Sequence, residues 1–265
     1  MKAWTLEAYG GAPTLRDDIP EPDGDDIVSV KATSVNPVDL WIIGGVMKQY
    51  AEYAFPVVLG RDFAGVTADG EEVFGMVGPI GANGVKEGAW AERIAAPPFI
   101  APKPSTLSLA EAGAAALAGV TALLCVEAVD VQAGERVLIV GANGGAGAFA
   151  VQLCVARGAA VVAPALEIDH AYLQGLGVSE LIERGEQPAA DAVIDLVGTE
   201  SFAERYVSSL TGVAAVSDPS AVARLGGLID EHGLKVPICE GFSFGEIPAA
   251  LSALGEHKQG KLSVV

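Results

Sequence analysis

The spacing of apolar residues along the chain changes near residue 105. Before this point, short apolar runs are separated by glycine, proline and acidic residues, which is typical of short strands joined by turns. The runs are Ile27–Val30, Val57–Leu59, Phe63–Val66 and Val73–Val77. The dipeptides Asp69-Gly70 and Asn83-Gly84 are turn signals of β-hairpins. We therefore expect residues 1–104 to form a small, irregular β-barrel.

Beyond residue 105, helical patterns alternate with short apolar runs. A helix is expected from Ser108 to Val129, because Ser108 and Glu111 have the spacing of a capping box. Further strands are expected over 137–140, 159–163, 192–197, 213–216 and 236–239, and helices over 148–157 and 219–232. This alternation predicts an α/β fold with a parallel, doubly wound sheet.

The two patterns predict two domains. Residues 1–104 form the first domain and residues 105–240 the second. Residues 241–265 contain a helical pattern and a short strand, and we expect them to return to the first domain and complete it.

A glycine-rich turn follows the first strand of the predicted sheet. It has the pattern Ala142-x-Gly144-x-x-Gly147 and lies between a buried strand and an apolar-faced helix, which is the context of a dinucleotide site. Glycines let the backbone approach a pyrophosphate, and the helix N-terminus presents amide groups and a positive dipole to it. We predict dinucleotide binding here rather than a purely structural turn. The candidate residues are Ala142, Asn143, Gly144, Gly145, Ala146 and Gly147.

The choice of dinucleotide is less defined by the sequence. NAD sites usually carry an acidic residue at the end of the second strand, but uncharged Ala165 stands near that place. A 2′-phosphate would favour Arg or Lys, and neither follows this strand; Glu167 and Asp169 have only His170 nearby. The sequence permits NADPH, and it does not exclude NADH.

Composition and charge exclude several classes of function. The formal net charge of −18 argues against nucleic acid and anionic membranes as partners, because phosphate groups attract Lys and Arg. No apolar run is long enough to span a membrane, and the N-terminus lacks the apolar core of a signal peptide. The three cysteines are isolated in apolar surroundings, which suits buried thiols in a reducing cytoplasm. Neither cysteines nor histidines have metal-ligand spacing, so we expect no metal site.

Several segments together resemble one family over nearly the whole chain. They are Asn36-Pro37-Val38-Asp39, 58–65 (VLGRDFAG), 117–122 (LAGVTA), the turn from Ala142 to Gly147, and Gly260-Lys261-Leu262. The resemblance is to the zinc-independent quinone oxidoreductases, such as zeta-crystallin, of the medium-chain dehydrogenase/reductase superfamily. It implies a GroES-like catalytic domain, a Rossmann domain, and NADPH-dependent hydride transfer to a quinone or an α,β-unsaturated carbonyl, without metal.

The resemblance also implies roles for individual residues. Asn36 corresponds to the residue that lines the nicotinamide end and could donate a hydrogen bond to the acceptor carbonyl. Asp39 either orients Asn36 or caps a helix. Thr121, Val197 and Gly198 correspond to residues beside the nicotinamide and its ribose. Trp41, Tyr50 and Tyr53 are candidates for an apolar substrate pocket, although aromatic residues are more often ordinary packing.

Three differences from relatives in the superfamily bear on the function. Where zinc-dependent relatives carry His-Glu, this chain has Arg61-Asp62, and we expect Arg61 to pair with Asp62 or another acid. The chain is also shorter than the family pattern at three places, so we expect a monomer or a weak homodimer. The shortening, and the absence of the Lys that many enone-reducing relatives carry where Trp41 stands, motivate an alternative function. This is a dinucleotide-binding redox sensor or accessory protein with little catalytic activity.

Overall fold

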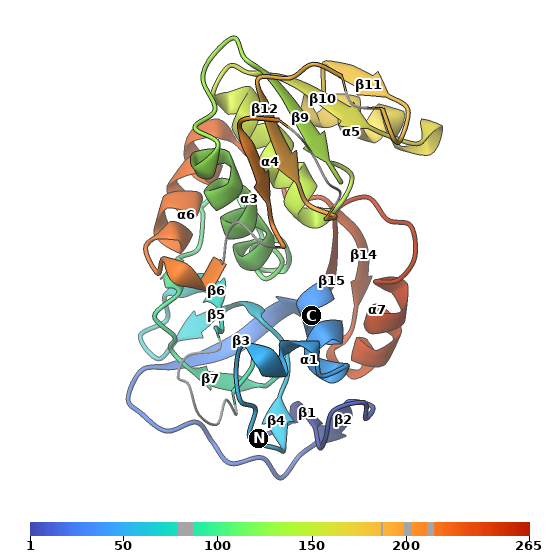
Figure 1. The fold of residues 1–265 in the computed structure, drawn as a ribbon. Helices are drawn as coiled ribbons and strands as arrows, with labels where there is room; N and C mark the ends of the chain where they lie inside the picture. Colours follow the sequence, from blue (N-terminus) through green and yellow to red (C-terminus); the bar gives the residue numbers. More distant parts are fainter. Residues whose placement is uncertain (79–86, 187, 199–202, 211–214) are drawn as a thin grey trace. The chain divides into compact units, whose positions relative to one another are not determined.

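The computed structural model describes residues 1–78, 87–186, 188–198, 203–210 and 215–265, which divide into two compact units (Figure 1). The first unit comprises residues 1–117, 240–257 and 262–265, and the second comprises residues 118–239 and 258–261. The division falls after Leu117 and not after residue 104, because the segment from 105 to 117 packs on the first unit. Gly113, for example, lies so close to Ala32 that a Cβ would come within 2.7 Å of its carbonyl carbon.

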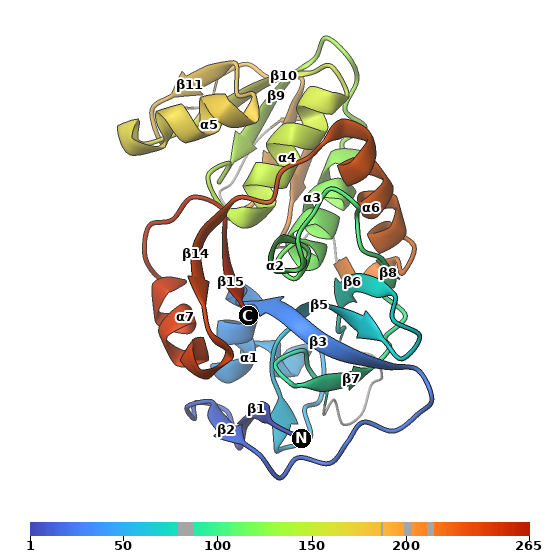
Figure 2. The same cartoon turned by 180° about the vertical axis from the view of Figure 1, so that it is seen from behind.

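The first unit is built on antiparallel strands (Figure 2). One sheet has the order β14-β15-β3-β5-β6-β8, with β7 paired to β3, and a smaller sheet has the order β2-β1-β4. The strands are β1 Ala3–Leu6, β2 Thr14–Arg16, β3 Ile27–Ser34, β4 Val57–Val58, β5 Asp62–Thr67, β6 Glu72–Met76, β7 Arg93–Ala95, β8 Ile100–Pro102, β14 Ile238–Phe242 and β15 Lys261–Val264. The helices are α1 Pro37–Ile43, η1 Val46–Gln49, α2 Leu109–Ala112, η4 Phe244–Glu246 and α7 Ile247–Ala253.

The turn predicted at Asp69-Gly70 is confirmed: it connects β5 to β6. Gly70 has a φ of 88°, and Thr67 and Glu71 close the turn from β5 to β6 through a 3.0 Å backbone hydrogen bond. Asn83-Gly84 lies outside the described residues. The predicted strands near residues 27, 57, 63 and 73 are confirmed as β3, β4, β5 and β6.

The second unit contains a five-stranded parallel sheet with the order β11-β10-β9-β12-β13. Its strands are β9 Arg136–Val140, β10 Ala160–Pro164, β11 Glu180–Ile182, β12 Ala192–Asp195 and β13 Tyr206–Ser208. Its helices are α3 Ala116–Ala128, α4 Gly145–Ala156, η2 Glu167–Asp169, α5 His170–Leu176, η3 Ala215–Ser217 and α6 Ala221–His232. The strand order runs outward in both directions from β9 and β12, so the topological switch point lies between these two strands.

Three predicted elements differ from the structure, and one of them is the strand expected over 236–239, which is β14 and pairs with β15 instead of joining the parallel sheet. The helix expected over 108–129 is interrupted between α2 and α3, because Gly113 approaches Ala32 and the chain must turn there. The predicted capping box at Ser108 is confirmed: its backbone amide donates to Glu111 over 2.9 Å. The strand expected over 213–216 falls largely outside the described residues, and Ala215–Ser217 forms a short 3-10 turn. The strand paired with β12 is instead β13.

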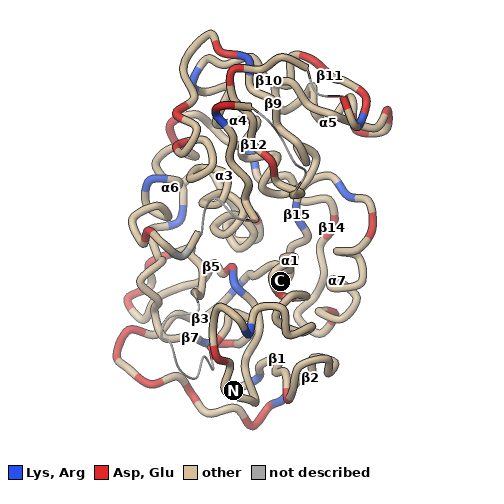
Figure 3. The backbone as a smooth tube through the Cα atoms, in the orientation of Figure 1, with Lys and Arg blue, Asp and Glu red and all other residues tan. Residues whose placement is uncertain are grey.

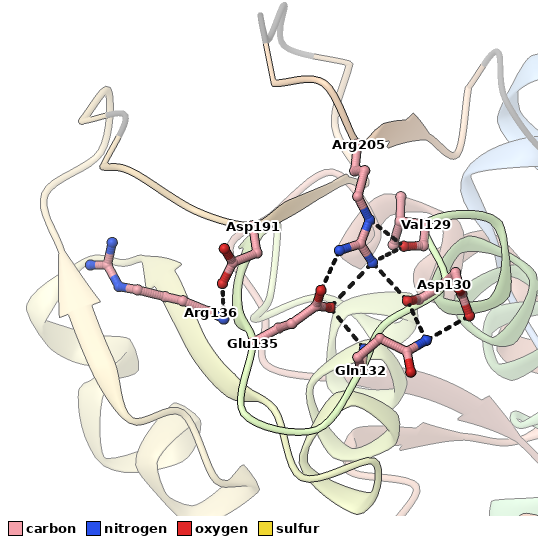
Figure 4. A network of polar contacts seen from close by, with 7 residues as sticks. All are labelled: Val129, Asp130, Gln132, Glu135, Arg136, Asp191 and Arg205. Carbon is pink, nitrogen blue, oxygen red and sulfur yellow. Dashed lines mark hydrogen bonds and ion pairs between the residues drawn. The ribbon is translucent and has the colours of Figure 1, made fainter.

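A network of hydrogen bonds and ion pairs connects the segments that precede β9, β12 and β13 (Figure 4). Arg205, just before β13, bonds to the Glu135 carboxylate and to the carbonyls of Val129 and Asp130. The Asp191 carboxylate, just before β12, accepts from the Arg136 amide over 2.8 Å. Because parallel strands all begin at one edge, this network lies at the opposite end of the strands from the glycine turn.

The structure also shows where the charged residues and the cysteine thiols lie. Asp and Glu residues are spread over both units and outnumber Lys and Arg (Figure 3). Cys125 and Cys154 are buried, and burial raises the pKa of each thiol to about 12. The prediction of three buried thiols is wrong for Cys239, which is exposed. Within the described ranges, no helix combines the length and apolarity that crossing a bilayer requires.

Candidate dinucleotide and acceptor sites

The glycine turn lies at the carboxyl end of β9, beside the switch point of the parallel sheet. Gly141 makes the reversal with a φ of 86°, and Gly144 is the N-cap residue of α4. A Cβ on Gly147 would lie 2.2 Å from the Gly141 carbonyl oxygen, so only glycine allows this approach of helix to turn. A Cβ on Gly144 would lie 3.6 Å from that same oxygen, within ordinary contact distance. Gly147 therefore serves the fold, whereas half-buried Gly144 has room for a side chain at the N-terminus of the helix.

A segment from the far end of the sequence is bonded to this turn. The Gly260 amide donates to the Asn143 carbonyl over 2.9 Å, and the Asn143 side chain donates to the Lys258 carbonyl over 3.2 Å. The stem of Lys261 covers Gly145, where a Cβ would lie 2.4 Å from Lys261 Cδ. Two lysines thus flank the turn, and burial lowers the pKa of Lys258. Gly260-Lys261 is part of the family resemblance, but no local pattern in the sequence predicts that these lysines lie at the glycine turn.

An ion pair between Asp169 and Arg184 lies beyond β10, at the place where dinucleotide-binding folds contact the cofactor ribose. Asp169 is fully buried, and its Oδ1 accepts from Gln259 Nε2 over 3.1 Å. Arg184, which follows β11, places Nη2 4.0 Å from Asp169 Oδ2 and is half-exposed. No basic residue follows β10 directly in the sequence, because Arg184 comes from the next strand of the sheet. The carboxyl ends of neighbouring parallel strands meet at one edge, which is the signal that could have identified it.

The carboxyl end of β12 contributes the turn with Val197 and Gly198. Asp195 is buried, and its Oδ1 accepts from the amides of both residues over 2.9 Å each. A Cβ on Gly141 would lie 2.8 Å from Val197 Cγ1, so the two turns are in contact. The structure therefore places the turn of Val197 and Gly198 against the glycine turn, and their contact with a nicotinamide stays a prediction. Thr121 lies on α3 of the same unit and is partly exposed.

The first unit contains a buried polar cluster around Asp62. Its Oδ2 accepts from Ser34 Oγ over 2.5 Å and from Asn36 Nδ2 over 2.9 Å, and its Oδ1 accepts from the Leu117 amide over 2.6 Å. Asn36 Nδ2 also lies 3.2 Å from Ser34 Oγ. Both amide hydrogens of Asn36 thus have acceptors inside the protein. Direct donation from Asn36 to an acceptor carbonyl would require one of these bonds to break.

Asp39 is the third residue of α1 and belongs to a capping box whose N-cap residue is Asn36. Its Oδ2 accepts from the Asn36 backbone amide over 2.8 Å at the start of α1. This contact supports the capping alternative for Asp39, and the same bond holds the backbone of Asn36 in place.

The expected pairing of Arg61 with an acid is not found among the described residues. Arg61 is 5% exposed, and its Nη1 donates to the Val77 carbonyl and its Nη2 to the Tyr53 hydroxyl, each over 3.0 Å. The neighbouring Asp62 carboxylate is directed instead to Ser34, Asn36 and Leu117. A buried guanidinium whose charge faces a phenol and a carbonyl is unusual, because buried charges are generally paired.

The three aromatic residues proposed for a substrate pocket have different environments. Tyr53 is buried and packs edge-on against Tyr9, with ring centroids 6.4 Å apart. Trp41 is 39% exposed and Tyr50 is 71% exposed. Burial therefore distinguishes Tyr53 from the other two. Among the described residues, no three His, Cys, Asp or Glu side chains are grouped to hold a metal ion.

Comparison with known proteins identifies the class of protein that this fold defines. No family model matches the chain. The quinone oxidoreductase from Coxiella burnetii superposes with a TM-score of 0.82 at 25% identity, covering 100% of this chain and 98% of that one. The fold is that of the medium-chain dehydrogenase/reductase superfamily, and the predicted fold class, a Rossmann-type sheet with a GroES-like β-barrel domain, is confirmed.

Named relatives agree with this assignment. NAD(P)H oxidoreductase RTN4IP1 of Mus musculus mitochondria is 28% identical over 263 residues, covering 82% of this chain and 65% of the relative. The probable acrylyl-CoA reductase AcuI of Escherichia coli (strain K12) is 34% identical over 204 residues, covering 70% and 62%. This chain spans less than two thirds of the length of these relatives. The chain belongs to the medium-chain dehydrogenase/reductase superfamily and is similar to its quinone oxidoreductase-like members.

Proposed function

We propose that this protein is an NADPH-dependent oxidoreductase that reduces a quinone or an α,β-unsaturated carbonyl without a metal ion. The observation that carries the proposal is the cradle at Gly144: an open glycine at the N-cap of α4, at the switch point of the sheet, with Lys258 and Lys261 beside it. The N-terminus of a helix presents amide groups and a positive dipole to a pyrophosphate dianion, and neighbouring lysines add positive charge.

The residues present fit a nicotinamide dinucleotide. The pyrophosphate would be held by the backbone from Ala142 to Gly147, and the nicotinamide end by Val197 and Gly198, with Thr121 in the same unit. When bound, the dinucleotide supplies a hydride. The protein contributes orientation, through a turn whose positions are fixed by Asp195 and by the bond between Gly260 and Asn143.

Metal independence is supported by the chemistry of the first unit. Arg61 and Asp62 stand where the resemblance places zinc ligands, and the Arg61 guanidinium is a fixed cation that would repel a metal ion. Asp62 holds the Asn36 side chain and Asp39 holds the Asn36 backbone, so Asn36 keeps a fixed position in this cluster. The described polar groups therefore favour an acceptor that is already electrophilic.

The preference for NADPH rests on Arg184. Its guanidinium lies at the end of β11, beside Asp169, and is half-exposed. We expect Arg184→Ala to weaken NADPH binding about tenfold and to leave NADH binding nearly unchanged, because only NADPH carries the 2′-phosphate that Arg184 would bind. Fluorescence titrations with both dinucleotides measure this difference.

Arg136→Ala is the matched control for this prediction, because it removes an equal charge from the same unit at the far end of the strands. It should leave both affinities unchanged. Equal losses for NADPH and NADH in Arg184→Ala would show that Arg184 does not read the 2′-phosphate.

Turnover tests the reaction itself. We expect the protein to oxidise NADPH in the presence of 1,4-benzoquinone, 9,10-phenanthrenequinone or cyclohex-2-enone, and we expect chelators to leave the rate unchanged. Absorbance of the reduced cofactor at steady state measures the rate. A dinucleotide-binding sensor would bind NADPH equally well but would show no acceptor-dependent oxidation.

A further inference from the structure

Asp169 lies where dinucleotide-binding folds carry the acid that holds the cofactor ribose, but its burial gives it another role. It ends the short helix η2 after β10, and its side chain is 0% exposed. An acid that accepts from ribose hydroxyls must be open to the ligand. A buried carboxylate instead needs donors and a countercharge from the protein, because it has lost its hydration. Asp169 therefore serves neighbouring side chains of the protein and not the ribose.

Arg184 supplies the countercharge and remains open to solvent. Its Nη2 atom lies 4.0 Å from Asp169 Oδ2, which is an ion pair beyond hydrogen-bond distance, and its side chain is 53% exposed. Among the described residues, Asp169 is the one acid paired with it. A guanidinium has five N–H donors, and this ion pair uses none of them in a hydrogen bond. Arg184 thus keeps its donors for a phosphate group of a ligand.

Gln259 supplies a hydrogen bond to the same carboxylate. Its Nε2 donates to Asp169 Oδ1 over 3.1 Å and to the Ile168 carbonyl over 3.0 Å. The residue before it, Lys258, accepts from the Asn143 side chain in the glycine turn over 3.2 Å. One short segment of the second unit is therefore bonded both to the glycine turn and to the helix η2 after β10.

We propose that Gln259 is a specificity-determining residue, which positions Arg184 for the 2′-phosphate of NADPH by donating to the Asp169 carboxylate. This inference rests on the proposed function. While Gln259 donates to Oδ1, Arg184 can neutralise Asp169 from 4.0 Å without forming a hydrogen bond to it. Without Gln259 the buried carboxylate has one donor fewer, and Arg184 is the cation placed to replace it. A guanidinium drawn inward to Asp169 is withdrawn from the phosphate of the ligand.

Loss of Gln259 should change the choice between the two dinucleotides. We expect Gln259→Leu to weaken NADPH binding about tenfold and to keep NADH binding within about twofold, because only NADPH carries the 2′-phosphate. Fluorescence titration measures both affinities. In displacement titrations, adenosine 2′,5′-bisphosphate should lose affinity by the same factor as NADPH, and adenosine 5′-diphosphate should lose none. Gln259→Asn, which shortens the side chain by one methylene, should show the same selective loss at a smaller size.

Gln152→Leu is the matched control, because Gln152 also fastens two distant segments of the second unit. Its Nε2 donates to the Lys235 carbonyl over 3.0 Å, and its Oε1 accepts from the Lys235 amide over 2.7 Å. The variant should lower the midpoint of thermal unfolding and leave the ratio of NADPH to NADH affinity unchanged. An equal loss of discrimination in Gln152→Leu would show that a loosened fold is sufficient, and it would overturn the inference.

A second substitution separates positioning from stability. Asp169→Asn removes the charge that would draw Arg184 inward, so adding it to Gln259→Leu should return NADPH affinity to within about threefold of the wild type. A defect of packing alone would instead grow with the second change. The inference is wrong if the double variant binds NADPH as weakly as Gln259→Leu. It is also wrong if Gln259→Leu weakens both dinucleotides equally or weakens neither.

These binding results are separable from the proposed reaction, because no acceptor is present. If the wild-type protein oxidises no NADPH with any acceptor, but Gln259→Leu loses NADPH selectively, the proposed reaction fails and the role of Gln259 stands. If the wild-type protein oxidises NADPH and Gln259→Leu discriminates as the wild type does, the role of Gln259 fails and the proposed reaction stands.

Discussion

Gly144→Val is expected to weaken NADPH binding at least about a hundredfold while the protein remains folded. Gly144 has a φ of −78° and a ψ of 178°, an extended conformation that valine adopts without strain. The nearest atom to a new Cβ is 3.6 Å away, so the fold has room for it. The branched side chain would occupy the surface over the first turn of α4, where the pyrophosphate must approach the amides. Cofactor fluorescence measures the affinity, and thermal unfolding measures the fold.

Two other glycines make this result interpretable. Gly175→Val, at a position of α5 with nothing within 4 Å, should keep cofactor affinity. Gly147→Ala should instead damage the fold, because its Cβ would lie 2.2 Å from the Gly141 carbonyl oxygen. Undiminished affinity in a folded Gly144→Val protein would place the dinucleotide elsewhere and remove the basis of the redox assignment.

Gly60→Ala is expected to destabilise the protein by about 4 kcal/mol. Gly60 has a φ of 92°, and its Cβ would lie 2.2 Å from Cδ1 of Trp90. Trp90 is fully buried, and its Nε1 donates to the Ser34 carbonyl over 3.0 Å, so it cannot move without disturbing that bond. The positive φ of residue 60 and the steric overlap with Trp90 would therefore both lower the free energy of unfolding of Gly60→Ala. Urea unfolding followed by tryptophan fluorescence measures the free energy.

Gly70→Ala separates the two contributions. Gly70 has a similar φ of 88°, but nothing lies within 4 Å of its Cβ position. We expect it to cost only about 1 kcal/mol, which is the conformational part alone. If the two variants were equally destabilised, the contact with Trp90 would carry no weight.

Local patterns predicted most of the secondary structure because the residues that decide it lie close together in the sequence. The capping box at Ser108 and the glycine turn before α4 are both set by residues within a few positions of one another. The break between α2 and α3 could not be predicted, because it is imposed by Ala32, which lies far away in the sequence.

The same distinction holds for the candidate sites. The turn from Ala142 to Gly147 was predicted from its own residues, whereas Lys258, Lys261 and Arg184 reach the site through tertiary contacts. In the first unit, the sequence drew attention to Arg61 but suggested the wrong partner. Asp62 adjoins it in a strand, where successive side chains point to opposite faces, and the Asp62 carboxylate is bonded elsewhere.

The attachment of residues 258–261 to the glycine turn has a consequence for biosynthesis. Asn143 and Lys258 are 115 positions apart, so the ribosome completes the turn long before it makes the segment that fastens it. A nascent chain can form β9, the glycine turn and α4 early. Residues 258–261, which include Lys258 and Lys261 and are bonded to the turn, are made only later. We therefore expect tight cofactor binding only in chains in which residues 258–261 have been made.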